Sequence, residues 1–431
     1  MSIAVVGMLD EREEALEIIR HRIEQRGHTA CLIDISIGTG AIIPAVKADV
    51  SCRELAALAE ASLGSAAVKK MPAASIMAEG LKAKILALLA SGELEGIIAI
   101  TGMTGALISL AAMKELPFGV PKLLISGATA QPVHANQFAD YFAVKDITVM
   151  NTVVDTVGMN ALVERLAING ANAISGLVEQ DPASPQDKRP SIAITEFGYC
   201  EKGAHYLREI LEKDHDLVSF HATGLGDKAA MDLVPQGIFS AFVDFVPGAF
   251  SEHLLGGNRG FVGPGRLDIA ATLPIPYIFC PGAFDMISCG PPERKDKDDP
   301  LWTSRKLAER KLHMHPPRVQ ARMSPEETEY VAAAVAERLN RYQHKERVKA
   351  VIPLKGFSSL SIEGAALCDP ASDRAFLMIL KKHLDPAIEV IEVDSDINSP
   401  VFARAVANAL SQAFRSQEKE TVLEGGLQRR D

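Results

Sequence analysis

The chain has 431 residues, of which 47% are hydrophobic and 23% are charged. This composition is that of a globular protein and excludes a disordered or fibrous one, and the length indicates two or three domains because a single core stops growing at about 250–300 residues. The 55 acidic residues outnumber the 45 basic ones and give a net charge of -10, which argues against nucleic acid and anionic membrane surfaces as partners.

Cysteine usage and the first residues indicate the compartment. The six cysteines form no Cys-x-x-Cys pair, so the sequence suggests neither a disulfide framework nor a zinc ribbon. The chain starts with an apolar strand pattern, without a basic leader region and without an apolar run of about 18 residues. We therefore expect a cytoplasmic protein that does not associate with membranes.

Apolar runs that end in glycine alternate with helical patterns over the first half of the chain. Asp10 and Glu13 form a capping box that predicts the start of the first helix, and Gly27 predicts its end. Strands are predicted over residues 3–6, 30–35, 96–100, 122–125 and 148–153, and further helices near 53–63, 78–90 and 160–169. This order predicts a doubly wound, parallel α/β domain over residues 1–180.

A change in composition separates this domain from a second one. Residues 181–190 contain three prolines and no bulky apolar side chain, which is typical of a linker. Strands are then predicted over 191–195, 217–220, 348–353 and 388–393, and helices near 204–211, 325–341, 373–383 and 401–414. We expect a second domain over 191–415 and a flexible tail over 416–431.

The two halves also resemble each other. Residues 120–128 align with residues 275–283 without a gap, and each segment contains a proline, an apolar strand and a Gly-Ala pair in the same places. Self-similarity over such a distance favours two Rossmann-like α/β domains, each a doubly wound parallel sheet, with a cleft between them. The alternative is that any two α/β segments look alike.

A proline-rich, charged stretch over residues 290–325 interrupts the second domain and contains Trp302. We expect a partly ordered arm or lid, because this stretch is too long for a plain connection. His313 and His315 lie two residues apart and suggest part of a metal site, although no third ligand is evident and no metal site is assigned. The arm is locally basic, so it either closes over an anionic ligand or is a solvated surface arm; the basic residues around the two histidines are Arg305, Arg310, Lys311, Arg318 and Arg322.

Ligands of parallel sheets bind beyond the carboxyl ends of the strands, where the glycine loops of the first half should meet. Backbone N–H groups and hydroxyls there can hold a nucleotide phosphate. The alternative is that these glycines only close tight turns. The candidate cofactor-binding residues of this half are Gly7, Gly38, Thr39, Gly40, Gly102, Met103, Thr104, Gly105, Ser126 and Gly127.

Titratable residues follow the strands of the second half. Glu196, His221 and Asp285 are candidate catalytic residues, because acids and a histidine from different strand ends can act as general acid and base. Asp244 also follows a strand, and either aspartate can instead cap a helix. Cys200 lies near a helix start, where a cysteine is either an activated thiolate or a small packed residue.

A dinucleotide-binding pattern occurs in the second half. Thr223 precedes Gly224-x-Gly226-x-x-Ala229, and Asp244 follows about twenty residues later, so Thr223, Gly224 and Gly226 are further candidate cofactor-binding residues. The pattern follows the second strand of its domain, whereas the fingerprint normally follows the first. The signatures of P-loop proteins, serine hydrolases and zincins do not occur.

Several motifs together resemble the Tm-one-like ATP-binding domain family, over nearly the whole chain to about Phe414. They include the following residues: Thr101-Gly102, Val120-Pro121-Lys122, Asp146-Ile147, Asp155-x-x-Gly158-x-Asn160, His221-Ala-Thr-Gly224-x-Gly226, Gly265-Arg266-Leu267, Pro281-Gly282-Ala283-x-Asp285-Met286, Pro353-Leu354-Lys355-Gly356 and Ile397-Asn398. The resemblance implies two Rossmann-like subdomains, a homodimer, and ATP with Mg²⁺ bound by the N-terminal subdomain through the loops at 38–40, 102–105 and 126–127. The chain departs from the family's Gly-Ser-Gly-Gly-Thr at residues 102–106, and from Phe-Gly-x-Thr-Thr at residues 197–201.

Three functions remain open. The first is a cytoplasmic ATP-binding protein, with or without enzymatic activity, that holds a second small molecule at the rim of its C-terminal domain. The second is a lyase or hydrolase that acts without ATP on a small anionic carbonyl or phosphorylated substrate, with His221 and Glu196 as acid and base. The third is a non-catalytic binding or scaffold protein.

Overall fold

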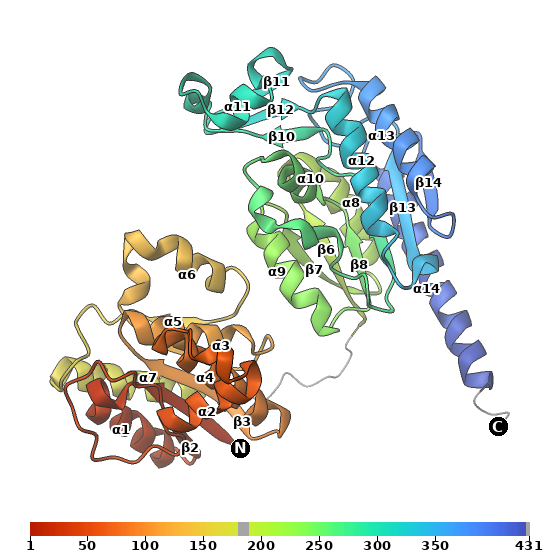
Figure 1. Cartoon of the computed structure of the whole chain (residues 1–431). Helices are drawn as coiled ribbons and strands as arrows, with labels where there is room; N and C mark the ends of the chain where they lie inside the picture. Colours follow the sequence, from red (N-terminus) through yellow and green to blue (C-terminus); the bar gives the residue numbers. More distant parts are fainter. Residues whose placement is uncertain (180–188, 428–431) are drawn as a thin grey trace. The chain divides into compact units, whose positions relative to one another are not determined.

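The computed structural model describes residues 1–179 and 189–427, and side chains up to residue 417. The chain divides into two compact units, Met1–Ser184 and Pro185–Asp431, which we call the N-terminal and C-terminal units and treat separately (Figure 1). Most of the linker predicted over 181–190 lies outside the described residues. No helix in the part of the chain that the structure describes is long and apolar enough to cross a membrane.

A five-stranded parallel sheet forms the middle layer of the N-terminal unit, in the order β2-β1-β3-β4-β5. The strands are β1 Ser2–Gly7, β2 Ala30–Asp34, β3 Leu94–Ile100, β4 Lys122–Ile125 and β5 Thr148–Met150. The helices are α1 Leu9–Gln25, α2 Cys52–Leu63, α3 Ser65–Val68, α4 Ala73–Ala90, α5 Met103–Lys114, α6 Ala135–Phe142 and α7 Ala161–Val178.

Helices cover both faces of this sheet, as the sequence predicts. The strands are nearly continuous apolar runs because both faces are buried. Side chains of α1 and α7 share one hydrophobic core with the sheet, and those of α2, α4 and α5 share the other. The unit is therefore doubly wound.

The start of α1 differs from the predicted capping box. Met8 is the N-cap residue and makes no side-chain cap. The Asp10 carboxylate instead accepts from the Gly40 amide over 3.0 Å, and Glu13 accepts from the Val46 amide over 2.5 Å. Both acids hold the loop after β2, which is a tertiary role that local spacing does not reveal.

The C-terminal unit is built on a six-stranded parallel sheet in the order β14-β13-β9-β8-β6-β7. Its strands are β6 Ser191–Glu196, β7 Asp216–His221, β8 Ala241–Asp244, β9 Tyr277–Phe279, β13 Val348–Pro353 and β14 Glu389–Val393. Its longer helices are α8 Glu201–Leu211, α9 Leu225–Leu233, α10 Gly248–Leu255, α12 Pro325–Leu339, α13 Pro370–His383 and α14 Pro400–Leu427. Helices α8 and α14 cover one face, and α9, α10, α12 and α13 the other.

The two sheets share one topology. Counted within its unit, the first sheet has the order 2-1-3-4-5 and the second 2-1-3-4-5-6. Strands β4 and β9, which carry the matching segments 120–128 and 275–283, hold the same fourth place. The internal similarity of the sequence therefore corresponds to two Rossmann-like units of like topology, the second with an additional edge strand.

The stretch over 290–325 is folded as part of the C-terminal unit. Strands β10 Met286–Ser288, β12 Arg318–Arg322 and β11 Leu312–His315 form an antiparallel sheet in that order, and α11 Pro300–Ser304 precedes β11. The Trp302 indole is buried and donates to the Cys289 carbonyl over 2.9 Å. A buried aromatic anchor fixes the stretch, which differs from the partly ordered lid that its composition suggests. Helix α14 likewise continues to Leu427, into the segment predicted to be a tail.

Candidate functional site

A cleft of about 700 Å³ lies at the carboxyl edge of the N-terminal sheet, and we call it the N-terminal cleft. In the order 2-1-3-4-5, ligands bind at the switch point between the first and third strands, β1 and β3. The cleft takes in this point through Arg12, Thr101 and Gly102, and it extends over the ends of β4 and β5. It is lined by Arg12, Thr101, Gly102, Met103, Gly127, Ala128, Ala130, Gln131, Pro132 and residues 151–157.

Arg12 supplies a buried guanidinium to this cleft. The side chain is 3% exposed, and the helix is kinked at this residue. Nε donates to Thr156 Oγ1 over 2.7 Å, Nη1 pairs with the Glu11 carboxylate, and Nη2 lies 4.0 Å from the Asp155 carboxylate. Within the described residues Nη2 makes no hydrogen bond, so one face of a fixed cation remains available to a ligand.

The start of α5 lies beside this cation. Gly102 is the N-cap of this twelve-residue helix, and no described side chain caps it. A Cβ at position 102 would stand 3.0 Å from Arg12 Nη2, so glycine leaves the space that the guanidinium uses. The buried hydroxyl of Thr101 lines the same cleft and has no hydrogen-bond partner among the described residues. Uncapped helix N–H groups and a cation together favour an anion here.

The opposite wall follows β4 and β5. A Cβ at Gly127 would stand 2.9 Å from Thr152 Oγ1, so the two loops approach closely where this glycine lies. Asp155 accepts from the Val157 amide over 3.0 Å, and its side chain is 80% exposed. Asn160 caps α7 by accepting from two helix amides. The family-like motif Asp155-x-x-Gly158-x-Asn160 therefore forms one wall of the cleft and the start of α7.

The structure brings only some of the predicted cofactor-binding residues into this cleft. Gly102, Met103 and Gly127 line it. The others do not line the cleft. Gly7 packs against Leu16, Gly105 packs against the Thr101 side chain, and the loop Gly38-Thr39-Gly40 is bound to Asp10 and Glu11. The Ser126 hydroxyl accepts from the Ala128 amide, and Thr104 is exposed on α5. Sequence reasoning missed Arg12, because nothing in its local pattern distinguishes it from the other charges of α1.

The motif Val120-Pro121-Lys122 and the pair Asp146-Ile147 have a structural explanation. The Lys122 side chain is buried at the start of β4 and pairs with Asp146 over 2.8 Å. Its ammonium group also donates to the carbonyls of Pro117 and Val120. These residues lie at the amino end of β4, away from the cleft at the carboxyl ends.

A second cleft, of about 430 Å³, lies in the C-terminal unit where β6 and β7 end, and we call it the C-terminal cleft. The small sheet β10-β12-β11 provides its other wall. The lining residues are Phe197, Gly198, Glu201, His221, Thr223, Asn258, Arg259, Ser288, Gly290, Pro317, Arg318, Val319 and Gln320.

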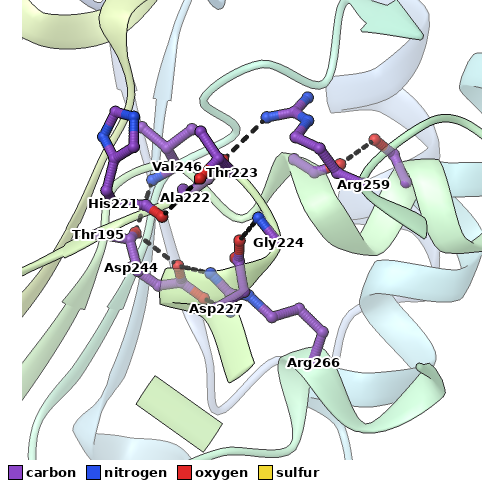
Figure 2. A network of polar contacts seen from close by, with 12 residues as sticks. Thr195, His221, Ala222, Thr223, Gly224, Asp227, Asp244, Val246, Arg259 and Arg266 are labelled. Atoms are coloured by element: carbon purple, nitrogen blue, oxygen red, sulfur yellow. Dashed lines mark hydrogen bonds and ion pairs between the residues drawn. The ribbon is translucent and has the colours of Figure 1, made fainter. Parts of the chain in front are cut away.

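Buried polar contacts hold the loop that carries His221 and Thr223, as Figure 2 shows. Arg259 donates to the Ala222 carbonyl over 3.2 Å, and the Thr223 amide donates to the His221 carbonyl over 2.7 Å. The Gly224 amide donates to the Asp227 carboxylate over 2.8 Å at the start of α9. Gly224, at φ +99°, adopts a backbone conformation that favours glycine. The dinucleotide-like pattern is thus a helix start after β7, the edge strand of its sheet.

The three candidate catalytic residues have different surroundings. Glu196 and His221 are register partners at the ends of β6 and β7. The Glu196 carboxylate pairs with Arg208 and accepts from Ser219 over 2.8 Å, whereas His221 is exposed and lines the C-terminal cleft. Asp285 is fully buried and accepts from the Ser358 hydroxyl over 2.7 Å. Of the three, only His221 lies in the cleft lining.

Two other candidates have structural roles. Asp244 is fully buried and binds Arg266, Thr195 and Tyr277. Cys200 is also buried; its thiol donates to the Phe357 carbonyl over 3.4 Å, and burial raises the pKa of this thiol. This environment keeps the thiol protonated and inert, which favours the packed-residue interpretation.

Comparisons with known proteins agree over most of the chain. The N-terminal domain model of the uncharacterised protein family UPF0261 matches residues 1–183, and the C-terminal domain model of the same family matches residues 189–414. A UPF0261 protein of Clostridium tetani is 30% identical over 414 residues, which cover 95% of this chain and 98% of that protein. The tomato ToMV resistance protein Tm-1(GCR237) is 27% identical over 363 residues, which cover 82% of this chain and 46% of that protein.

Proposed function

We propose that this chain, which belongs to the uncharacterised protein family UPF0261, binds ATP with Mg²⁺ in its N-terminal cleft. The observation that carries the proposal is the buried Arg12 guanidinium, whose Nη2 stands beside Gly102 at the uncapped start of α5. A cation and a helix N-terminus that face one cleft match the charge and the acceptors of a polyphosphate.

The rest of the cleft fits the other parts of a nucleotide. Its volume of about 700 Å³ lies within the range of small-molecule pockets. Ala128, Pro132 and Val153 offer apolar surface for a base, while Thr101 offers a buried hydroxyl without a partner. The resemblance to the Tm-one-like ATP-binding domain family supports ATP as the nucleotide.

Magnesium binds oxygen ligands and usually bridges substrate phosphates to one or two carboxylates. Among the described residues Asp155 is the carboxylate in the cleft lining, and Glu11 pairs with the other terminal nitrogen of the Arg12 guanidinium. Asp155 would hold the ion, and Mg²⁺ would neutralise phosphate charge. Arg12 would orient the phosphates through Nη2.

Calorimetric titration of the full chain with Mg-ATP tests this proposal. We expect saturable binding that weakens at least about tenfold in Arg12→Met, because a charge-assisted hydrogen bond is worth about 1.5–3 kcal/mol. Gly127→Val should weaken binding as well, since its side chain enters the cleft beside Thr152. The matched control is Arg20→Met, which removes a more exposed arginine of the same helix.

Two results would overturn the proposal. One is no saturable heat with millimolar Mg-ATP in the wild-type chain. The other is equal affinity in Arg12→Met, Gly127→Val and the control. Thermal unfolding of each variant separates loss of binding from loss of folding.

A cytoplasmic homodimer is the other part of this proposal, and it comes from the sequence and the family resemblance. In the N-terminal unit, β5 is an edge strand, and Val149 on it and Val153 just after it are exposed apolar side chains. Light scattering should give the mass of two 46.3 kDa chains. A mass of one chain at micromolar concentration would contradict the dimer.

A further inference from the structure

We propose that the C-terminal cleft is a second small-molecule site, which binds an oxyanion, carboxylate or phosphate, between the ends of β6 and β7 and the small sheet. This inference stands apart from nucleotide binding in the N-terminal unit. It rests on the side-chain pattern of β12, on the fixed amide group of Gln320, and on the framework that holds the loop after β7.

Strand β12 presents alternating faces. Val319 and Ala321 point into the hydrophobic core, so Arg318 and Gln320 point to the opposite face, where they line the cleft. The register places Ser288 and His313 directly beside Gln320 on the neighbouring strands. Around Gln320 the small sheet therefore has one apolar face in the core and one polar face toward the cleft.

Gln320 is the buried polar group of this face. It is 3% exposed, and its carbonyl oxygen accepts from the Ser288 hydroxyl over 2.8 Å. This bond fixes the orientation of the amide group. The amide nitrogen makes no hydrogen bond with any described residue and belongs to a side chain in the cleft lining. This nitrogen is not one of the fully buried polar atoms that lack a partner, so it is accessible from the cleft. An accessible N–H donor on a side chain of fixed orientation is available to a ligand acceptor.

Arg259 lines the C-terminal cleft and is held in place by its neighbours. Its Nε and Nη2 donate to Glu252 over 2.8 and 2.6 Å, and its guanidinium stacks 4.6 Å from the Phe197 ring centroid. Glu252 also accepts from the Ser288 amide over 3.0 Å, which ties this pair to β10. The pair is neutral as a whole, so it fixes the shape of the cleft without setting its net charge.

Arg318 gives the C-terminal cleft its positive charge. The other arginines and the lysine named in the arm are bound within the unit: Arg305 and Arg310 to Glu327, Arg322 to Asp373, and Lys311 to the Cys368 carbonyl. Arg318 is exposed, lines the cleft and makes no ion pair with the described residues. The basic arm thus offers one unengaged guanidinium, at this cleft.

The donors define the ligand class. Arg318, the Gln320 amide and His221 can all donate, whereas the Thr223 hydroxyl already donates to the His221 carbonyl over 3.4 Å. Glu201 is the one carboxylate besides the paired Glu252 at this cleft, within the described residues. Surplus donors around a cation favour an anion with several oxygens. Carboxylate and phosphate share this chemistry, and a volume of about 430 Å³ suits a small metabolite.

The experiment is a calorimetric titration of the full chain with sodium phosphate and, separately, with disodium malate, at constant ionic strength. All proteins carry Arg12→Met, which removes the cation of the N-terminal cleft from the measurement. We expect saturable binding of at least one probe, weakened about tenfold or more by Arg318→Met and by Gln320→Leu. The probe that binds more tightly identifies the source of the oxyanion.

Arg341→Met is the matched control, because Arg341 is an exposed arginine of the same unit, on the short turn after α12, and among the described residues it pairs only with Glu337. Its affinity should equal that of the parent. A fourth variant, Gly198→Leu, places a side chain in the cleft without a contact at its Cβ and should also abolish binding. No saturable heat with either probe, or equal affinity in Arg318→Met and the control, would overturn the proposal.

Discussion

Arg266 donates two hydrogen bonds to the single carboxylate of Asp244, over 2.7 and 2.8 Å, and neither side chain is exposed to solvent. Its Nε donates to Asp227 over 2.5 Å, so one guanidinium joins the end of β8 to the start of α9 (Figure 2). This geometry explains the motif Gly265-Arg266-Leu267 as part of the framework beneath the loop that carries His221.

Arg266→Met should therefore lower the free energy of unfolding of the C-terminal unit by about 3–5 kcal/mol, because it leaves two carboxylates buried without their cation. Urea unfolding, followed by a probe in the C-terminal unit such as Trp302 fluorescence, measures this loss. Arg341→Met, which removes a largely exposed ion pair, should cost less than about 1 kcal/mol. Equal losses in both variants would refute the structural role of Arg266.

Two glycines in helix interiors of the N-terminal unit should respond to alanine with opposite signs. At Gly80 in α4, a Cβ would stand 2.1 Å from the Leu55 carbonyl of α2, so alanine forces two packed helices apart. At Gly176 in α7, nothing lies within 4 Å of the added Cβ. We expect Gly80→Ala to lower the melting temperature, and Gly176→Ala to stabilise by about 0.5–1 kcal/mol through helix propensity. Differential scanning calorimetry measures both, and a stabilised Gly80→Ala would contradict the close helix crossing.

The strands and their order along the chain could be predicted from sequence because parallel strands buried on both faces are apolar runs that end in glycine loops. The like topology of the two units could be predicted from the gapless match of 120–128 with 275–283. Partners far apart in the sequence could not be predicted. Arg12 meets Thr156 across 144 residues, and Asp10 binds Gly40 instead of capping its own helix.

The same limit applies to the candidate sites. Gly102, Gly127 and His221, which the strand-end positions select as candidates, line the two clefts, since strand ends define the rim of a parallel sheet. Strand-end positions could not show that Glu196 is paired with Arg208, or that Asp285 is covered by the loop after β13. Gln320 lies in a stretch whose composition resembles an arm, and its alternating pattern over five residues is too short to predict a strand.

Cys200 should resist alkylation in the folded chain. Its side chain is fully buried, and burial raises the pKa of the thiol, so it offers neither access nor thiolate. Mass spectrometry after iodoacetamide treatment at pH 8 should find Cys368, which is partly exposed, modified well before Cys200. Rapid native-state labelling of Cys200 that is lost in Cys200→Ser would instead indicate an accessible nucleophile.

The contribution of Asp285 and Asp373 to the stability of the C-terminal unit should fall as the pH rises from about 4 to 6, because burial disfavours the ionised form of both carboxyl groups. Burial raises the pKa of Asp285, whose Oδ1 has no hydrogen-bond partner among the described residues, and it raises the pKa of Asp373 to about 6 despite the bond to Arg322. The folded chain therefore binds protons more tightly than the unfolded chain, and this contribution is fully present below the ordinary aspartate pKa of about 4. It is lost as the pH rises through the folded values.

Asp285→Asn removes one of these groups with little change of shape, and Asn can still accept from Ser358. Relative to the wild type, we expect this variant to gain stability between pH 4 and pH 7, by about 1.4 kcal/mol for each unit by which the pKa of Asp285 is raised. Urea unfolding at pH 4, 5.5 and 7 measures the difference, and Glu329→Gln, at an exposed position of α12, is the control that should show no such trend. If the free energy of unfolding of the wild type instead rises relative to that of Asp285→Asn as the pH rises, the protein stabilises the ionised form of the buried carboxyl group. The sign derived from its burial would then be wrong.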